Sequence, residues 1–446
     1  MKKSFKYALL FVAASALTTG FTSCGSSNDD PTPVNLLAEQ NTAIKALTNT
    51  YLEAVVYPTY TNLANECETL FSQISAFNTK LQGNQNVTDE EVKTICNTYK
   101  TARKYWEESE AFLYGAASDF NIDPHIDSWP LDLPTLKNIL VRKDVLDNFK
   151  NMNENDAITY ARKTLSEDGQ LGFHGVEFIF FRDGNPRPAS VFNNNQKEVY
   201  EGFISESDGI TAQAEVLYAK VVAGDLRDKT FQLEVAWRGN TAAATHVARV
   251  TECQNNGSFG VDYGTTTKTK LSYGADLLAA GTAQSSLASS SVKKVLETIF
   301  VAGCSNICSE VADQKMGQAY RSANGQGKKD DDPNYIESPY SYNSFADFYD
   351  NIMSIQNSLY GNIGANTGSY ASTSIMAFLA KYYPDAATSL QAKLTSALAA
   401  LNACKTSGTP FVKEPGASTV GTAINAVGEL DDELNQVSNR VLKGTN

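Results

Sequence analysis

Histidine is scarce in this chain: His125, His174 and His246 are the only three among 446 residues. The common zinc-protease motif, His-Glu-x-x-His, needs two histidines four positions apart on one helix, and no such pair occurs. The inverted motif, His-x-x-Glu-His, is absent too, because Phe178 follows Glu177. A carboxypeptidase-like set of His174, Glu177 and one distant histidine would need a fold with a mixed sheet. The sequence therefore disfavours the familiar histidine-rich metallopeptidases.

Basic residues are outnumbered as well. The chain has 37 Lys and Arg against 50 Asp and Glu, which gives a formal net charge of −13. Phosphate binding needs a basic surface, so the composition argues against nucleic acid as a partner. Phosphate-binding glycine loops, dinucleotide fingerprints and serine nucleophile elbows are also missing. An acidic chain is compatible with attracting cations, although charge alone does not identify a ligand.

Cysteines are few for an exported chain of this length. One of the seven, Cys24, belongs to the N-terminal signal described below, and the others are Cys67, Cys96, Cys253, Cys304, Cys308 and Cys404. An even number permits disulfides, but the low density does not require them. Cys304 and Cys308 are four apart on a predicted helix, a spacing that would suit a metal. Because no His or further Cys lies near them, buried apolar thiols are the favoured interpretation.

Long apolar runs are rare, and the clearest one lies at the N-terminus. Three lysines precede an apolar stretch at residues 8–17, which is too short for the roughly 20 residues that span a bilayer. Phe21-Thr22-Ser23-Cys24-Gly25 then resembles a bacterial lipobox. We predict a signal peptide at 1–23, lipidation of Cys24 after cleavage, and a polar tether at 24–35. The alternative is a plain secretory signal with an unrelated cysteine.

The residues after Cys24 are small, polar and acidic. They resemble the surface-export signal of Bacteroidetes lipoproteins. We therefore expect a cell-envelope protein that is lipid-anchored to the outer membrane and meets the membrane through this anchor only. Exposure on the cell surface and a periplasm-facing position both remain open.

Hydrophobic residues recur at helical spacing along almost the whole chain, and alternating, strand-like stretches are scarce. We predict an all-α protein of two helical bundles, 36–200 and 201–446. Thr88 to Glu91 forms a capping box that starts one helix. The predicted helices cover 36–81 with Pro58 as a kink or division, 88–115, 134–149, 154–166, the segment around His174, 196–253, 287–321, 343–360, 373–404 and 418–442. Residues 119–134, 254–274 and 324–339 are predicted loops.

His174 and Glu177 form the most informative pair. Three positions apart on a helix, they face the same side. An imidazole and a carboxylate make half of a zinc or iron site, or a base with the group that orients it. The flanking Gly172 and Gly175 each cost the helix roughly 1 kcal/mol relative to alanine, which indicates a close approach to the backbone. The alternative is one His–Glu hydrogen bond inside a core.

Further carboxylates lie upstream. Glu107 and Glu110 share one face of a predicted helix, and an acid-rich loop at 123–130 follows. Two carboxylates from one helix and a His-x-x-Glu pair from another resemble the way that helical bundles bind iron. The order of the pair is reversed from the di-iron pattern, and a second pair is missing, so a mononuclear site is favoured. The alternative is a solvated acidic helix face.

Three blocks of the sequence resemble the imelysin-like proteins. Residues 172–177 match the Gly-x-His-x-x-Glu signature, 106–112 with Trp129-Pro130 resemble an earlier helix and loop of the family, and 337–352 resemble a late segment. The blocks occur in the family's order, and the resemblance covers about 36–446. It implies two helical bundles packed around a site between them.

The resemblance also implies candidate site residues. His174 and Glu177 would carry the signature's role, with Glu107, Glu110 and Asp127 as further metal ligands. A second set would bind the ligand, with part of it facing the metal from the second bundle: Trp106, Trp129, Arg238, Ser338, Ser341 and Asp347. Tyr342 stands where relatives often have histidine, which removes one further ligand.

The expected function follows from these residues. The leading hypothesis is a lipoprotein that binds a divalent metal, iron or zinc, or a small metal-bearing ligand, for iron acquisition with an outer-membrane uptake partner. The first alternative is an imelysin-type metallopeptidase that uses Glu177 as ligand or base. The second is a non-catalytic surface protein that binds a partner, with His174 and Glu177 as a structural clamp.

Overall fold

The computed structural model describes residues 33–165, 170–260, 262–364 and 368–443. The predicted signal peptide, Cys24 and most of the predicted tether lie outside these residues. The chain divides into two compact units, Met1–Glu39 and Gln40–Asn446. Of the first unit, the structure describes the start of helix α1 (Pro33–Tyr51). Everything below concerns the second unit.

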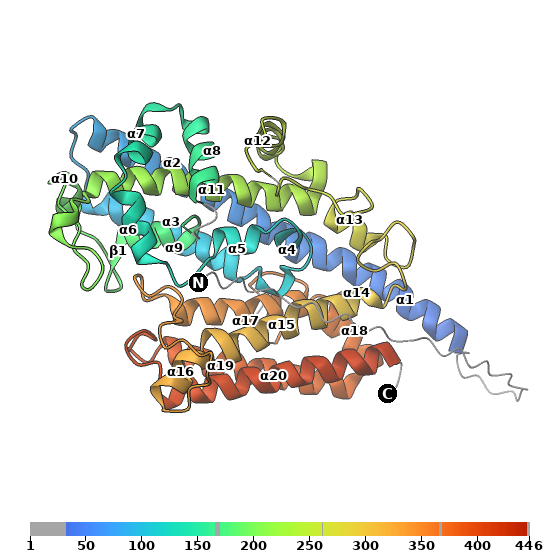
Figure 1. Ribbon diagram of the computed structural model, residues 1–446. Helices are drawn as coiled ribbons and strands as arrows, with labels where there is room; N and C mark the ends of the chain where they lie inside the picture. The colour runs from blue at the N-terminus through green and yellow to red at the C-terminus, as the bar shows by residue number, and fades with distance from the viewer. Residues whose placement is uncertain (1–32, 166–169, 261, 365–367, 444–446) are drawn as a thin grey trace, which may run out of the picture. The chain divides into compact units, whose positions relative to one another are not determined.

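Helices make up nearly all of the secondary structure, as the sequence predicts (Figure 1). Among the described residues, the strands are a two-stranded antiparallel hairpin in which Phe181 pairs with Pro186. The first part of the unit comprises η1 (Leu52–Val56), α2 (Tyr57–Gln82), α3 (Asp89–Glu107), η2 (Glu110–Phe112), α4 (Ala116–Asp119), α5 (Ile122–Ile126), α6 (Leu133–Leu140), α7 (Lys143–Asn151), α8 (Glu154–Leu165), α9 (Phe173–Phe180), β1 (Phe181–Arg182), β2 (Asn185–Pro186) and α10 (Ala189–Asn193).

The remaining elements follow the hairpin. They are η4 (Glu206–Asp208), α11 (Ala212–Arg238), η5 (Gly239–Thr241), α12 (Ala244–Asn255), α13 (Tyr273–Leu278), α14 (Lys294–Glu297), η6 (Thr298–Ser305), α15 (Asn306–Ser309), η7 (Glu310–Lys315), α16 (Gly317–Ala323), α17 (Ser344–Tyr360), α18 (Ile375–Tyr382), α19 (Pro384–Lys405) and α20 (Ser418–Lys443). Here η1, η6 and η7 are π-helical, and η2, η4 and η5 are 3₁₀ turns.

The first bundle is built on α2, α3, α8 and α11, which pack side by side (Figure 1). Helix α3 starts at the predicted capping box: Glu91 N donates to Thr88 Oγ1, and Thr88 N donates to Glu91 Oε2. Its buried stripe runs from Val92 through Tyr99 to Trp106, at helical spacing. Helices α11 and α12, which follow residue 200 in the sequence, pack in this first bundle. The predicted division of the chain into two domains near residue 200 stays a prediction.

The second bundle consists of α17, α18, α19, α20 and the continuous helical run 294–323 (Figure 1). This run is long and apolar enough to cross a membrane by length and composition. Most of its larger apolar side chains, such as Ile299 and Ile307, are buried, although Val301 is exposed, and the run packs against α20. The composition is thus that of a core helix. Helix α3 of the first bundle contacts α17 of the second, so the two bundles meet along these helices.

Several predicted elements have different limits. The helix predicted at 134–149 is divided into α6 and α7, the one at 373–404 into α18 and α19, and the one at 196–253 into α11 and α12. The predicted loop 119–134 contains the short helix α5. The run predicted at 36–81 is divided by the π-helical η1, and Pro58 occupies the first turn of α2, where its missing N–H costs nothing. The helix predicted to reach Gly115 ends at Glu107, and the chain turns before η2. Helix α11 starts at Ala212 instead of near residue 196, because residues 197–211 form isolated bridges and the short turn η4.

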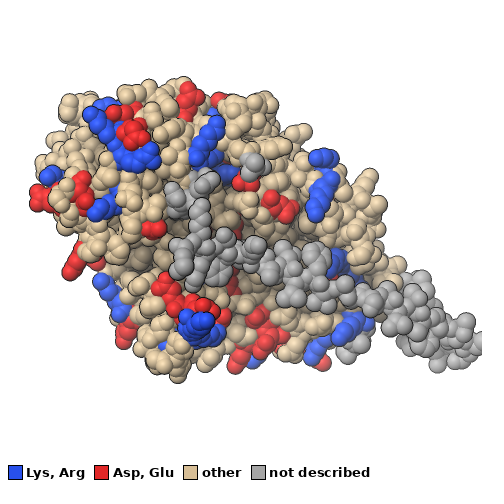
Figure 2. Space-filling model, viewed as in Figure 1, with Lys and Arg blue, Asp and Glu red and all other residues tan. Residues whose placement is uncertain are grey.

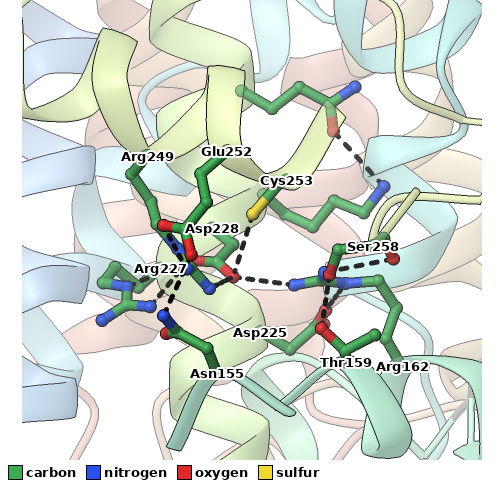
Figure 3. A network of polar contacts seen from close by, with 12 residues as sticks. Asn155, Thr159, Arg162, Asp225, Arg227, Asp228, Arg249, Glu252, Cys253 and Ser258 are labelled. Atoms are coloured by element: carbon green, nitrogen blue, oxygen red, sulfur yellow. Dashed lines mark hydrogen bonds and ion pairs between the residues drawn. The ribbon is translucent and has the colours of Figure 1, made fainter. Parts of the chain in front are cut away.

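A polar network fixes α8 and α12 to α11 (Figure 3). The carboxylate of Asp228 on α11 accepts from Arg162 Nη2 at 3.0 Å, from Arg249 Nη2 at 2.7 Å and from Arg227 Nη2 at 2.8 Å. One turn earlier, Asp225 accepts from Arg162 Nε at 2.5 Å. Both aspartates are fully buried. Their charges are compensated by the guanidinium groups, so this network joins three helices.

The described cysteines support the interpretation of their spacing as core packing. Each of the six thiols is buried and unpaired, including Cys304 and Cys308 in the second bundle.

On the face shown in Figure 2, acidic and basic side chains are interspersed. Groups of carboxylates with the spacing of metal ligands are buried inside the protein.

Candidate functional site

The predicted site residues lie on several segments that meet between the two bundles. Those from the first bundle are Trp106 and Glu107 of α3, Glu110 of η2, Asp127 after α5, and His174 and Glu177 of α9. Those from the second are Ser338 and Ser341, in the loop before α17, and Asp347 of α17. All of them are buried, with at most 7% of their surface exposed. We call them, together with Arg103, Lys315, Glu337 and Asn351, the central cluster.

Gly172 brings Asp127 to His174. Residue 172 has φ +90°, and a Cβ there would lie 2.0 Å from the carbonyl oxygen of Ile126. A side chain cannot fit, so glycine lets the start of α9 touch the end of α5. As a result Asp127 Oδ1 lies 3.1 Å from His174 Nε2. The close backbone approach that the sequence predicted is made by the protein's own chain.

Gly175 has a similar explanation. A Cβ at this position would meet the hydroxyl of Tyr218 at 2.5 Å, and that hydroxyl donates to the carbonyl oxygen of Gln170 at 2.6 Å. The glycine therefore allows α9 to pack closely against α11. Both glycines of the signature serve the placement of α9.

Glu177 holds the second bundle to the first. Its Oε1 accepts from Tyr340 N at 3.1 Å, from Ser341 N at 2.8 Å and from Ser341 Oγ at 2.7 Å. Its Oε2 lies 3.1 Å from His174 Nδ1. Both carboxylate oxygens are thus engaged, and Glu177 acts as a clamp on the loop before α17.

His174 bridges Glu177 and Asp127 through its two ring nitrogens. Burial opposes protonation of the ring, but the bonds to both carboxylates prevail and raise the pKa of His174 to about 9. Trp106 Nε1 also donates a hydrogen bond to Asp127 Oδ2 at 2.7 Å. Burial opposes its charge, but Arg103 and His174 hold the pKa of Asp127 well below its usual range. In this arrangement His174 is an imidazolium whose two ring nitrogens both contact carboxylates.

Arg103 lies at the centre of the cluster, fully buried on α3. Its guanidinium forms ion pairs with Asp127, Glu107 and Glu337, and its Nε lies 3.7 Å from Asp347 Oδ2. Burial opposes its charge, yet the surrounding carboxylates raise the pKa of Arg103 above its usual value. Arg103 thereby compensates part of the negative charge that both bundles contribute.

Lys315 is the second permanent cation, placed by the π-helical η7. Its Nζ lies 3.2 Å from Glu337 Oε2, 3.5 Å from Glu107 Oε2 and 3.7 Å from Glu110 Oε1. Gly303 allows this approach, because a Cβ there would lie 2.0 Å from the carbonyl oxygen of Ala111. The helical run 294–323 therefore packs directly on η2, which carries Glu110.

Burial changes the acid–base behaviour of the remaining carboxyls. Burial raises the pKa of Glu107 and Glu110 well above the usual range, although Arg103 and Lys315 oppose this rise. Burial likewise raises the pKa of Asp347 to about 6, against the effect of Arg103. Ser338 Oγ and Asn343 Nδ2 donate to the two oxygens of Asp347 at 2.5 and 2.6 Å. The cluster holds more carboxyl groups than it has cations to pair with them.

Three groups within the cluster have the spacing of metal ligands. They are Asp127 with His174 and Glu337, Glu107 with Glu337 and Asp347, and Glu107 with Glu110 and Asp127. In each group the ligand atoms lie within 4.8 Å of one another. Among the residues that the structure describes, Glu177 belongs to none of these groups. Its role as a ligand stays a prediction, and so do the roles of His174, Glu107, Glu110 and Asp127, each of which belongs to at least one group.

Two of the predicted ligand-binding residues differ in their position: Trp129 lies near Lys315 of the central cluster, and Arg238 does not. The rings of Trp129 and Tyr335 are tilted by 40° with 4.1 Å between their centroids, and Lys315 Nζ lies 5.8 Å from the centroid of the Trp129 ring. The structure does not bring Arg238 to the cluster. At the end of α11 its Nη1 donates to Thr61 at 2.7 Å and to Glu234, one turn earlier on the same helix.

Sequence reasoning missed Arg103, Lys315, Glu337 and Asn351. Arg103 lies one turn before Glu107 within an apolar stripe, and Lys315 lies in a helical run with long apolar stretches. A charged residue in such a setting is rarely buried without partners, and this signal could have found both. Glu337 and Asn351 carry no comparable local signal.

The comparisons with known proteins bear on the family and the fold. The family model described as imelysin matches residues 56–434. Iron-regulated protein A of Synechococcus elongatus is 24% identical over 138 residues, which is 30% of this chain and 31% of that relative. The chain thus aligns with about a third of the relative's length.

A solved structure, titled as an iron-regulated protein A precursor from Parabacteroides distasonis, shares 23% sequence identity with this chain. The match covers 90% of this chain and 95% of that one, with a TM-score of 0.67. This likeness shows that the two proteins share a fold. Because the family model matches most of the sequence, the chain belongs to the imelysin family.

Proposed function

We propose that the central cluster binds a divalent cation and that the protein takes part in iron acquisition. One observation carries the proposal. Six buried carboxyl groups face two permanent cations, Arg103 and Lys315, and one imidazolium, His174. The six are Glu107, Glu110, Asp127, Glu177, Glu337 and Asp347. Buried negative charge in such excess requires protons or a further cation.

The donor atoms suit a hard or borderline cation. Carboxylate oxygens are ligands for divalent iron and similar ions, and Glu107, Glu110 and Asp127 supply one such set. The fully buried Asn351 adds a side-chain oxygen, Oδ1, that has no hydrogen-bond partner among the described residues, while its Nδ2 donates to Glu107. An unsatisfied buried oxygen beside the carboxylates is the feature that a cation would satisfy. We infer that Glu107, Glu110, Asp127 and Glu337 would hold the ion.

Burial favours binding over peptide cleavage. Each carboxyl group of the cluster is at most 7% exposed. A polypeptide substrate would have to reach these groups through closely packed helices, whereas an ion needs little space. A peptidase would also need a metal-bound water beside the scissile bond. The arrangement supports the capture of an ion or a small metal-bearing ligand.

The direct test is calorimetric titration of the purified protein with Fe(II) under anaerobic conditions, and with Zn(II). The informative variant is Glu110→Gln. It removes the charge of a proposed ligand carboxylate, which also forms an ion pair with Lys315. Glu108→Gln is the matched control, because Glu108 is also buried but pairs with Lys104 instead. We expect wild type and Glu108→Gln to bind one ion and Glu110→Gln to bind at least tenfold more weakly. Equal affinity of all three proteins would refute the proposal.

The cellular setting is proposed from the sequence. Lipidation of Cys24 would attach the protein to the cell envelope, and the names of the two relatives, iron-regulated protein A, support a link to iron. Labelling with a fatty-acid analogue tests the anchor, with Cys24→Ala as the control. Growth of a deletion strain under iron limitation, compared with one that carries Glu110→Gln, tests the role in acquisition.

A further inference from the structure

Lys315 occupies an unusual position for a lysine. It is 1% exposed, and its ammonium lies between carboxylates of both bundles. The separations of 3.2 to 3.7 Å are longer than the roughly 2.7–2.9 Å of a tight charge-assisted hydrogen bond. The ammonium donates a long hydrogen bond to Glu337 Oε1 at 3.3 Å, lies 3.2 Å from Glu337 Oε2, and is farther from Glu107 and Glu110.

These three carboxylates also belong to the groups with the spacing of metal ligands. An ammonium and a divalent cation repel each other strongly in a buried setting, so they cannot share the same oxygens. Whatever cation the cluster binds must compete with Lys315. Arg103 also occupies three carboxylates of these groups, Glu107, Asp127 and Glu337, but its guanidinium pairs with all three at once, whereas Lys315 has a single ammonium.

A fourth carboxylate, that of Glu310, also interacts electrostatically with Lys315. Glu310 begins the π-helical η7 and Lys315 ends it, so the two residues are five positions apart, close to one π-helical turn. Glu310 is half-buried, whereas Glu107, Glu110 and Glu337 are fully buried. The lysine side chain has a flexible four-carbon stem, so its ammonium can move toward Glu310 without a change in the helix.

We propose that Lys315 is a built-in competitor of the bound cation, which sets the affinity of the site by exchanging between the buried carboxylates and Glu310. The inference rests on the proposed function and identifies what controls it. A competing ammonium weakens binding and shortens the residence of the ion. Such a site suits a protein that transfers its ion onward.

The test compares Lys315→Met, which removes the charge and keeps the volume, with Lys315→Arg, which keeps the charge. Titration with Fe(II) and Zn(II) should show at least tenfold tighter binding by Lys315→Met than by wild type. Lys315→Arg should bind no more tightly than wild type. The rise in melting temperature on adding metal should also be largest for Lys315→Met. If Lys315→Met binds as wild type does, or more weakly, the inference is wrong.

Glu310→Gln provides an independent test, which does not depend on the folding of Lys315→Met. It removes the outer partner of the ammonium, and we expect several-fold weaker binding than in wild type. This loss of affinity should disappear when Glu310→Gln is combined with Lys315→Met. Unchanged affinity of the single variant Glu310→Gln would overturn the inference. If wild type binds no better than Glu110→Gln, the proposed function fails and this inference fails with it. If wild type binds and Glu110→Gln does not, the Lys315 and Glu310 variants decide the inference alone.

Discussion

Gly172 and Ile126 touch through their backbones: a Cβ on residue 172 would lie 2.0 Å from the carbonyl oxygen of Ile126. This contact places Asp127 beside His174, with 3.1 Å between Oδ1 and Nε2. The first glycine of the family signature is therefore a packing requirement. It joins the loop that carries Asp127 to the helix that carries His174 and Glu177.

Gly172→Ala should destabilise the protein strongly. The substitution combines an unfavourable positive φ with a backbone clash, and we expect a loss of at least about 2 kcal/mol in the free energy of unfolding. Chemical denaturation measures this loss. Gly202→Ala is the matched control, since residue 202 also has a positive φ, +79°, but nothing lies within 4 Å of a Cβ added there. A similar loss in both variants would show that φ alone matters and that the contact with Ile126 does not.

The sequence predicted the local parts of this site better than their assembly. The pair His174 and Glu177 follows from helical spacing, and the capping box at Thr88 follows from a local motif. The approach of Asp127 depends on a contact between chain segments 46 positions apart in the sequence. Lys315 was missed because π-helical turns shift the spacing that helical periodicity assumes. Arg238 was misplaced because its helix packs in the first bundle.

Gly303→Ala should weaken the site from the second bundle. The new methyl group would meet the carbonyl oxygen of Ala111, so η6 must move away from η2, which carries Glu110. Overpacking of this kind costs about 1–3 kcal/mol, and metal affinity should fall with it. Gly428→Ala on α20 is the control, because nothing lies within 4 Å of the added Cβ. We expect that control to retain or slightly gain stability, as alanine favours helix. An unaffected melting temperature in Gly303→Ala would contradict the packing argument.

His174→Ala should cost stability whether or not metal is present. The imidazolium bridges Glu177 and Asp127, and its removal leaves both buried carboxylates with one partner fewer. Loss of one partner of a buried ion pair costs about 3–5 kcal/mol. Thermal melts in the presence of a chelator and in the presence of Zn(II) measure the two conditions. A loss of stability that appears with Zn(II) but not with chelator would show that His174 acts as a ligand and not as a clamp.

Asp228→Asn should loosen the network that joins α8 and α12 to α11 (Figure 3). Arg162, Arg227 and Arg249 would each lose an ionic acceptor, and Arg162 is itself buried. The expected loss is about 3–5 kcal/mol in the free energy of unfolding. Asp144→Asn is the control, because Asp144 also pairs with an arginine, Arg142, but on the surface. We expect little change in that variant, since exposed ion pairs contribute little. Equal effects of the two substitutions would refute a special role for the buried network.

The same network should make the protein sensitive to acid. Burial opposes the charge of Asp225, but His125 and Arg162 hold its pKa below the usual value. Burial also opposes the charge of Asp228, and there Arg249 and Arg162 keep the pKa below the usual value. A depressed folded-state pKa means that the unfolded chain binds the proton more readily. The stabilisation is therefore present above the unfolded pKa, about 3.9, and is lost as the pH falls through the folded pKa.

We accordingly expect the free energy of unfolding to decrease by roughly 1–3 kcal/mol as the pH falls from 5 to 3, part of it through these two aspartates. Urea denaturation at several pH values measures this slope. Asp228→Asn removes one of the two titrating groups, so its slope in this range should be shallower than that of wild type. Parallel slopes would mean that other carboxyls carry the acid dependence. The buried pairs with arginine would then contribute to folding without being linked to protons in this range.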